Sequence, residues 1–251
     1  MDQSTAGGSE CKVSVALIEI YQESVQDLLN RSRDEIGSSL RVRESPTEGV
    51  YVENLTWVPV SARGGIMEQL SMGLRHRRIA HTQMNAKSSR SHCLFMVNLE
   101  QENGGEIVSS KLCLADLAGS EKVKKSGVEG AKLEEAASIN QSLSTLGHCI
   151  MTLSKGKGGH VPYRDSKLTF ILKDSLGGNS KTALIVACSP SMSSFEETVS
   201  TMQFAQRAKS VQNLATINRS DNLDELKNLV EKLRGELKQL REDYSTIEEQ
   251  L

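Results

Sequence analysis

The pattern of hydrophobic and polar positions divides the chain near residue 218. Before it, apolar runs rich in β-branched residues alternate with amphipathic stretches, and after it the pattern is helical only. This alternation predicts an α/β fold in which helices sandwich a mixed sheet. The expected strands are Lys12–Tyr21, Leu40–Arg43, Val50–Thr56, Cys93–Glu100, Lys111–Asp116 and Thr182–Ser189, the last one apolar enough to be covered on both faces. The expected helices are Glu23–Asn30, a helix capped by Ser61 and running to about Arg78, Glu129–Leu153, Ser166–Leu176 and Phe195–Asn213.

The C-terminal segment carries a stricter pattern. Its apolar residues are spaced alternately three and four apart, which is the heptad repeat of a left-handed coiled coil. We therefore expect a coiled coil over residues 221–251 and a homodimer formed through it. The alternative, an amphipathic helix lying on its own domain, usually has a wider apolar stripe. The heptad positions are Leu223, Leu226, Val230, Leu233, Leu237, Leu240, Tyr244, Ile247 and Leu251.

The composition narrows the classes of function. Lys and Arg number 30 and Asp and Glu 32 in 251 residues, so the chain is no wholesale polycation, although a local basic patch fits. No apolar run approaches the about 18 residues that a membrane-spanning helix needs. The polar residues 1–11 lack the core of a signal peptide and are expected to be disordered. Five cysteines without a CxxC pair predict buried free thiols in a reducing compartment, and no zinc site is expected.

A serine-rich loop, Asn85–His92 (NAKSSRSH), joins an expected helix to an expected strand. Hydroxyl oxygens can ligate Mg²⁺, and a guanidinium pairs with phosphate or carboxylate. Two adjacent serines beside Arg90 therefore suit metal and phosphate binding. Taken alone, the motif also fits a serine-rich loop with a solvated arginine.

A second motif, Asp116–Glu121 (DLAGSE), directly follows an apolar strand. An acidic residue at this place holds Mg²⁺ in phosphate-binding folds, and Gly119 lets the backbone approach a γ-phosphate. Taken alone, it also fits an ordinary turn at the end of a strand. A Ser/His/Asp hydrolase built from Ser91, His92 and Asp116 is the rival chemistry, but the sequence has no G-x-S-x-G elbow.

With both motifs in order, residues 12–213 resemble the kinesin motor domain. The first motif is similar to switch I of that family and the second to its switch II. The resemblance implies a P-loop-NTPase-like α/β fold and microtubule-stimulated ATP hydrolysis that drives movement. Further similar segments are Glu19–Tyr21 with Asp27–Leu29, Ile139–Leu143, His160–Thr169, Asp174–Asn179 and Phe204–Lys209.

The resemblance implies roles for individual residues. Gly119 would sense the γ-phosphate, and Arg90 and Glu121 would form a salt bridge that latches the two switches in the ATP state. The implied catalytic residues are Ser88, Ser89, Arg90, Asp116, Gly119 and Glu121. Those implied to contact ATP are Asn85, Ser88, Ser89, Asp116 and Gly119, with Ser89 and Asp116 near Mg²⁺.

One part of the family's pattern is missing. The sequence contains no G-x-x-x-x-G-K-[ST], because Ser175 and Ser180 stand where the motif requires glycine before Lys181. In the family, the P-loop strand lies between the strands matching Lys111–Asp116 and Thr182–Ser189. We therefore expect the C-terminal two-thirds of a motor with an incomplete sheet, and we expect ATP and Mg²⁺ for the complete protein. The alternative function is a microtubule-binding, dimerising protein without ATPase activity.

Basic residues concentrate between Lys122 and Lys181, where the local charge balance is +5. In the family this stretch faces acidic tubulin, so the resemblance implies microtubules as the partner and a location in the cytoplasm on the cytoskeleton. Aromatic residues are sparse in the stretch, so nucleic acid is not expected. Residues 214–220 correspond to the neck linker. The implied microtubule contacts are Lys155, Lys157, His160, Tyr163, Arg164, Lys167 and Lys173.

Overall fold

The computed structural model describes residues 10–30, 39–46, 49–84, 90–103, 106–120, 131–156, 159–221, 230–238, 240–241 and 244. The chain divides into two compact units. The larger consists of Ser14–Val97 and Leu112–Thr216, and the smaller of Met1–Val13, Asn98–Lys111 and Ile217–Leu251. No described helix is long and apolar enough to cross a membrane.

The main sheet of the described chain has six strands, and a separate hairpin supplies two more. Five strands of the main sheet follow the order β2 (Ser24–Asp27), β1 (Glu10–Tyr21), β6 (His92–Asn103), β7 (Glu106–Asp116) and β8 (Asn218–Asp221). The sixth, β5 (Val58–Pro59), pairs with β1. The hairpin consists of β3 (Val42–Ser45) and β4 (Gly49–Val52). The predicted α/β architecture is confirmed.

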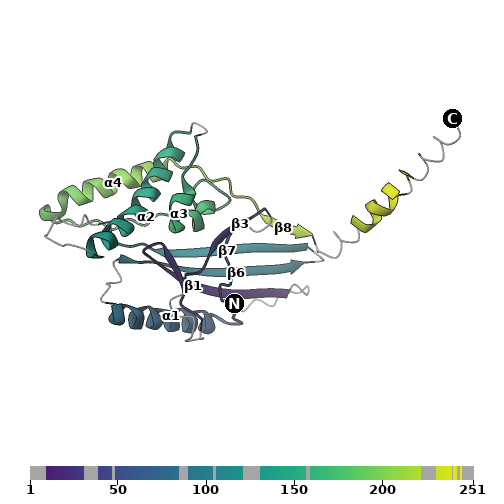
Figure 1. Cartoon of the computed structure of the whole chain (residues 1–251), viewed down its shortest axis with the longest axis horizontal. Helices are drawn as coiled ribbons and strands as arrows, with labels where there is room; N and C mark the ends of the chain where they lie inside the picture. Colours follow the sequence, from purple (N-terminus) through teal and green to yellow (C-terminus); the bar gives the residue numbers. More distant parts are fainter. Residues whose placement is uncertain are drawn as a thin grey trace. The chain divides into compact units, whose positions relative to one another are not determined.

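Strand β1 shows why the sheet is covered on both faces. Successive side chains of a strand point to opposite faces. Val15 and Leu17 belong to one buried cluster with residues of α1, whereas Ala16, Ile18 and Ile20 belong to another with residues of the remaining helices. Figure 1 shows α1 on one face of the sheet and α2, α3 and α4 on the other. The helices are α1 (Arg63–Met84), α2 (Ala131–Ser154), α3 (Lys167–Ile171) and α4 (Phe195–Lys209), with short 3-10 helices at Tyr163–Asp165 (η3), Lys173–Ser175 (η4) and Met192–Ser194 (η5).

The segment expected as a helix over Glu23–Asn30 is instead strand β2, so that prediction was wrong. A two-residue turn at Gln22 and Glu23, both with positive φ, folds the chain back onto β1 and pairs Tyr21 with Ser24. This pairing buries Val25 completely. Eight residues form at most a marginal helix, so tertiary packing decides the local structure.

The strand expected over Thr182–Ser189 is also absent from the described sheet, and that prediction was wrong. The segment has no strand assignment, and Ile185 is 95% exposed. Strand β8 pairs with β7 only through Glu106–Ser109. Beyond that point Leu112 and Leu114 of β7 are each more than half exposed. An apolar segment forms a strand only where a neighbour satisfies its N–H and C=O groups, and the described residues supply no such neighbour here.

The remaining boundaries differ in detail. Helix α1 runs to Met84, beyond the expected end near Arg78. The expected helix over Ser166–Leu176 is α3, capped by the Ser166 hydroxyl, followed by η4. Helix α4 ends at Lys209 rather than Asn213. Residues 230–238 are helical with exposed heptad positions, and the coiled coil itself stays a prediction.

The prediction of buried free thiols holds for only some of the cysteines. Cys93 and Cys149 are buried, and burial raises the pKa of each thiol to about 11. Cys113 is half-buried. Cys11 and Cys188 are exposed, so the prediction was wrong for these two. Cys188 is exposed because it lies in the unpaired segment Thr182–Ser189.

Candidate functional site

A buried arginine connects four segments of the larger unit. Arg77, on α1, is 6% exposed. Its Nε donates to Glu19 Oε1 of β1 at 3.0 Å, and one terminal nitrogen donates to Asp116 Oδ2 at the end of β7 at 3.2 Å. Its other terminal nitrogen donates to the backbone oxygen of Ser91 at 3.1 Å and to the Ser91 hydroxyl at 3.2 Å. Arg77 therefore joins Ser91, near the end of the serine-rich loop, to the first residue of the second motif.

The partner of Arg77 on β1 is equally buried. Glu19 is 2% exposed, and its Oε1 also accepts a hydrogen bond from the Ser91 hydroxyl at 2.5 Å. A carboxylate removed from water needs both an opposite charge and hydrogen bonds, and here Arg77 and Ser91 supply them. The fork of the guanidinium fixes the directions of its partners, so this cluster sets the geometry at the carboxyl end of β7.

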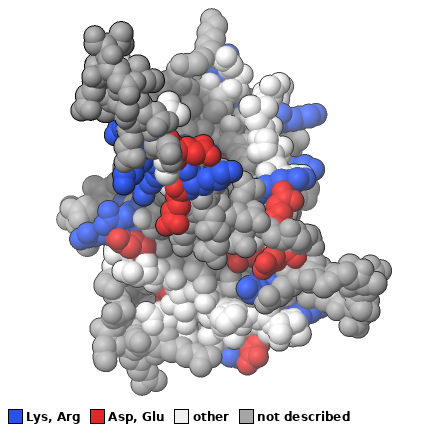
Figure 2. Space-filling model, turned by 90° about the vertical axis from the view of Figure 1, so that its right-hand side faces the viewer, with Lys and Arg blue, Asp and Glu red and all other residues white. Residues whose placement is uncertain are grey.

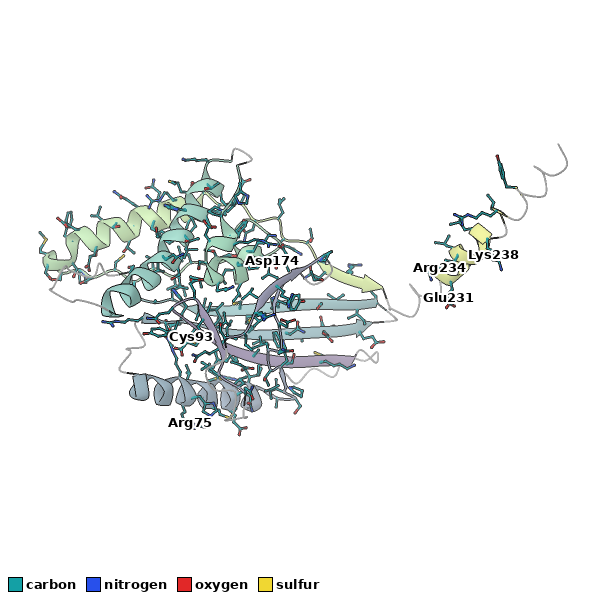
Figure 3. The ribbon with its side chains drawn as sticks, viewed as in Figure 1. Arg75, Cys93, Asp174, Glu231, Arg234 and Lys238 are labelled. Atoms are coloured by element: carbon teal, nitrogen blue, oxygen red, sulfur yellow. The ribbon has the colours of Figure 1, made fainter. Side chains whose placement is uncertain are left out.

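His92, the first residue of β6, makes a second buried connection beside Arg77. Its Nδ1 accepts a hydrogen bond from the Ala118 amide at 3.0 Å, and its Nε2 lies 2.8 Å from the Ser142 hydroxyl on α2. Burial, with a contribution from the charge of Arg77, lowers the pKa of His92 to about 4. The imidazole is therefore neutral at physiological pH. Figure 3 labels the next residue, Cys93, in the sheet.

The structure excludes the rival hydrolase. A nucleophilic serine needs its hydroxyl on the histidine and the histidine on the carboxylate. Instead, the Ser91 hydroxyl donates to Glu19, and both nitrogens of His92 are bonded to Ser142 and Ala118. Asp116 pairs with Arg77. These three residues form no catalytic triad.

The predicted nucleotide-contacting residues lie partly within the described chain. Asp116 ends β7 with a side chain that is 76% exposed. Gly119 follows in the segment 117–120, and Arg90 is exposed just before Ser91. Arg77 thus lies beneath the chain segments that carry these three residues. Asn85, Ser88, Ser89 and Glu121 lie outside the described residues, so the Arg90–Glu121 latch stays a prediction.

The predicted microtubule contacts lie on the elements around α3. Tyr163 and Arg164 belong to η3, Lys167 begins α3 and Lys173 begins η4, while Lys155 and His160 are exposed in the connection before η3. Lys157 lies outside the described residues. The Tyr163 hydroxyl donates to the Leu176 carbonyl at 2.5 Å, and burial raises its pKa. This hydroxyl therefore holds the turn after η4 in place.

A glutamate of the β3–β4 hairpin lies against two of these cations. Glu44 pairs with Arg164 at 2.7 Å and with Lys173, and the two cations hold the pKa of its carboxyl below the ordinary value. Arg164 also lies over the Phe170 ring, with its Cζ 4.9 Å from the ring centroid. The close approach of hairpin and helix recurs at Gly49, where an added Cβ would lie 3.6 Å from the carboxylate of Asp174, the η4 residue labelled in Figure 3.

The segment after α4 folds back onto the turn before Thr182–Ser189. Asn213 Oδ1 accepts from the Gly177 amide at 2.7 Å, and Asn213 Nδ2 donates to the Ser180 carbonyl at 2.8 Å. The Leu214 amide donates to the Gly178 carbonyl at 3.0 Å. The start of the linker-like segment is therefore held by the Gly177–Ser180 turn, through the Asn213 side chain and the Leu214 amide.

Sequence reasoning missed the structural roles of Arg77, Glu19, His92 and Glu44, although the first two carry a signal. It named Glu19 only within a kinesin-like segment and His92 only in the serine-rich motif and the rival triad. Arg77 lies seven residues after Leu70, on the apolar face of its helix, and Glu19 interrupts a buried apolar strand. A charge on a buried face needs a partner, so two such charges in different segments predict one another. For His92 and Glu44 the partners depend on the tertiary fold, and no local pattern indicates them.

A comparison with known protein families identifies the family of this chain. Residues 1–211 match the family model described as the kinesin motor domain. The chain belongs to the kinesin motor domain family. The resemblance seen in the motifs is thereby confirmed. A Dictyostelium discoideum relative, kinesin-related protein 3, is 46% identical over 91% of this chain and 19% of its own length. A kinesin heavy chain of Syncephalastrum racemosum is 49% identical over 90% of this chain and 24% of its own length.

Solved kinesin structures share the fold. The structure of a fast kinesin, described in relation to ATPase mechanism and microtubule interactions, superposes with a TM-score of 0.79 at 47% identity, covering 86% of this chain and 61% of that one. A KIF14 dimer with two heads bound, in complex with AMP-PNP and a microtubule, gives a TM-score of 0.74 at 40% identity, with 85% and 62% covered. The kinesin fold is confirmed, and the chain spans about a quarter or less of the two curated relatives described above.

Proposed function

We propose that this chain is the switch and track-binding part of a microtubule motor whose complete form couples ATP hydrolysis to movement. The observation that carries the proposal is the buried Arg77 cluster, which bonds Asp116 and Ser91 at the inner ends of the two switch-like motifs. In a motor, both segments must respond together to the γ-phosphate. The buried hydrogen bonds of Arg77 join the two segments, so that they could respond together.

The residues on the switch side fit an ATP–Mg²⁺ site. Asp116 has an exposed side chain whose Oδ2 pairs with Arg77, and a carboxylate of this kind could hold a hydrated Mg²⁺ ion. Bound ATP–Mg²⁺ would supply the phosphate that is hydrolysed. The triphosphate is gripped mainly by P-loop amides and lysine, and this sequence has no such motif. The chain's own residues would therefore detect the γ-phosphate, but they would not supply the main contacts that bind the triphosphate.

The proposed track is the acidic surface of a microtubule. Arg164, Lys167 and Lys173 lie on η3, α3 and η4; η3 and α3 pack against α2, and η4 packs against α3. On the face shown in Figure 2, Lys and Arg side chains are interspersed with Asp and Glu rather than gathered in one basic patch. Local placement of cations, and not the net charge of the chain, therefore has to provide the affinity for an acidic partner.

The C-terminal segment supports a parallel homodimer. Val230, Leu233 and Leu237 occupy heptad core positions on a helix and are exposed in the single chain. Counting the same heptads, Glu236 and Arg241 fall at g and e positions, which pair between the chains of a parallel coiled coil. Figure 3 shows Glu231, Arg234 and Lys238 along this helix. We infer dimers on the microtubule cytoskeleton of the cytoplasm.

Co-sedimentation with microtubules tests the track-binding part. The 251-residue chain should pellet with microtubules, and the affinity should fall as salt rises. Arg164→Ala with Lys173→Ala should weaken binding about tenfold or more, since charged contacts to an acidic partner carry a few kcal/mol. Lys209→Ala, which removes an exposed cation at the end of α4, is the matched control. Equal binding by control and double variant would refute the assigned face.

The missing P-loop motif favours a second candidate, a microtubule-binding dimer without ATPase activity. The two candidates agree on the track and differ in turnover. Because the first candidate assigns hydrolysis to the complete form, ATP hydrolysis is measured with and without microtubules on this chain joined to a kinesin N-terminal segment that carries the P-loop. Turnover stimulated by microtubules would identify a motor, whereas binding without turnover would identify the second candidate.

A further inference from the structure

His92 makes hydrogen bonds to two elements that are distant in the sequence. The ring is 2% exposed, and both of its partners, Ala118 and Ser142, are buried. Ala118 directly precedes Gly119, the residue expected to sense the γ-phosphate. Ser142 lies on α2, the helix that packs against η3, α3 and α4. The ring therefore lies between the loop after β7 and the helix behind the cations that are proposed to face the track.

The direction of each bond follows from the donor at Ala118. A backbone amide can only donate, so Nδ1 carries no proton and accepts at 3.0 Å. A neutral imidazole then has its proton on Nε2, which donates to the Ser142 hydroxyl at 2.8 Å. The Ala118 amide thus sets the tautomer, and the Ser142 hydroxyl, which can donate or accept, accepts from Nε2. Losing either partner leaves a buried polar group unsatisfied, which is costly.

We propose that His92 is a positioning residue that holds the Ala118–Gly119 backbone in register with helix α2. This inference rests on the proposed function, because it assigns the two ends of the connection to nucleotide sensing and track binding. The ring acts through its two hydrogen bonds and takes no part in the reaction itself. A movement of α2 would then displace the Ala118 amide through the His92 side chain. A movement of the loop after β7 would displace α2 through the same side chain.

The tautomer is tested first, on the unaltered 251-residue chain labelled with ¹⁵N-histidine. The expected spectrum has one ring, buried and non-titrating near neutral pH, with a protonated Nε2 and an unprotonated Nδ1. Assignment of that ring to His92 comes from its loss in His92→Gln. A protonated Nδ1 on this ring would overturn the proposal, because it could not accept from Ala118.

The coupling is tested by amide hydrogen exchange at Ala118 in four variants. His92→Asn keeps a short acceptor near the position of Nδ1 and should retain slow exchange, while His92→Gln reaches toward Ser142 and should exchange about tenfold faster. Ser142→Ala, which never contacts Ala118, should also speed exchange at Ala118, and Ser142→Thr should restore it. Equal rates in the two His92 variants, or no effect of Ser142→Ala, would show a packing role only and overturn the proposal.

A separate readout distinguishes this inference from the proposed function. Microtubule co-sedimentation of the unaltered chain tests track binding and does not depend on His92. Binding together with an unchanged Ala118 amide in Ser142→Ala would leave the proposed function intact and overturn the coupling. Loss of binding with the expected exchange pattern would overturn the proposed function, and the hydrogen-bonded connection would stand as a property of the fold.

Discussion

Replacing Arg77 by methionine tests whether the buried cluster organises the site. The change removes the ion pairs with Glu19 and Asp116 and both bonds to Ser91, and it keeps a side chain of similar length. The Glu19 carboxylate, 2% exposed, then loses the counter-charge of Arg77. Removing one member of a buried pair costs about 3–5 kcal/mol, so the free energy of unfolding should fall by that amount.

The partner variant and a double-mutant cycle locate the cause. Glu19→Gln leaves Arg77 bonded to Asp116 and Ser91, so it should cost less, about 1–3 kcal/mol. The double variant carries no unpaired charge at this position. Its cost should therefore be smaller than the sum of the single costs by about 2 kcal/mol.

Urea denaturation at neutral pH, followed by far-ultraviolet circular dichroism, measures these differences. Arg75→Met is the matched control, because Arg75 is exposed on the same helix and points away from the sheet in Figure 3. A surface change of this kind alters stability by about 0.5 kcal/mol or less. If Arg77→Met cost no more than Arg75→Met, or if the cycle were additive, Arg77 would not be the organising residue of the site.

Three further outcomes follow from the structure. Below about pH 6.5 the His92 side chain takes up a proton in the unfolded chain, whereas in the folded chain it does so only near pH 4. The free energy of unfolding should therefore fall as the pH falls between these values, by up to about 3 kcal/mol at full protonation. Urea melts at a series of pH values should show a shallower fall in His92→Gln, and an identical pH profile would contradict this. A maleimide probe should label exposed Cys188 within minutes and leave buried Cys149 unlabelled until the chain unfolds, as mass spectrometry would show; equal labelling rates would refute the assigned burial. Leu233→Asp should abolish dimers in analytical ultracentrifugation, whereas a wild-type chain that stays monomeric at high concentration would exclude the coiled-coil dimer.

The elements that the sequence predicted correctly are those whose structure is set by their own pattern. Residues 12–21 are rich in β-branched residues and lie within β1, and most of the long amphipathic stretch predicted over 129–153 lies in α2 (Ala131–Ser154). Strand β2 was missed because its pairing partner, the edge of β1, is decided by tertiary structure. Thr182–Ser189 failed for the opposite reason, since its pattern is that of a strand but no described neighbour pairs with it.

The residues of the candidate site also differ in whether a local pattern indicates them. Asp116 and Gly119 could be proposed from the sequence because a short motif places them at the end of a strand. Arg77 was not found, because its partners come from three other segments and only the fold brings them together. A buried charge on the apolar face of a helix is nevertheless visible in a sequence, and a search for pairs of such charges would have indicated the cluster.

The most direct test of the account is the microtubule affinity of the 251-residue chain with ATP–Mg²⁺, with ADP–Mg²⁺ and without nucleotide, at one fixed salt concentration. We assign this chain a track-binding face and the sensing residues of the switches, whereas its sequence has no P-loop motif to bind the phosphates. We predict salt-sensitive binding whose dissociation constant is the same in all three conditions within about twofold, because without differential nucleotide binding no population can shift. A dissociation constant that changes about tenfold between ATP and ADP, a coupling of about 1.4 kcal/mol, would contradict the account, as would the absence of binding in every condition.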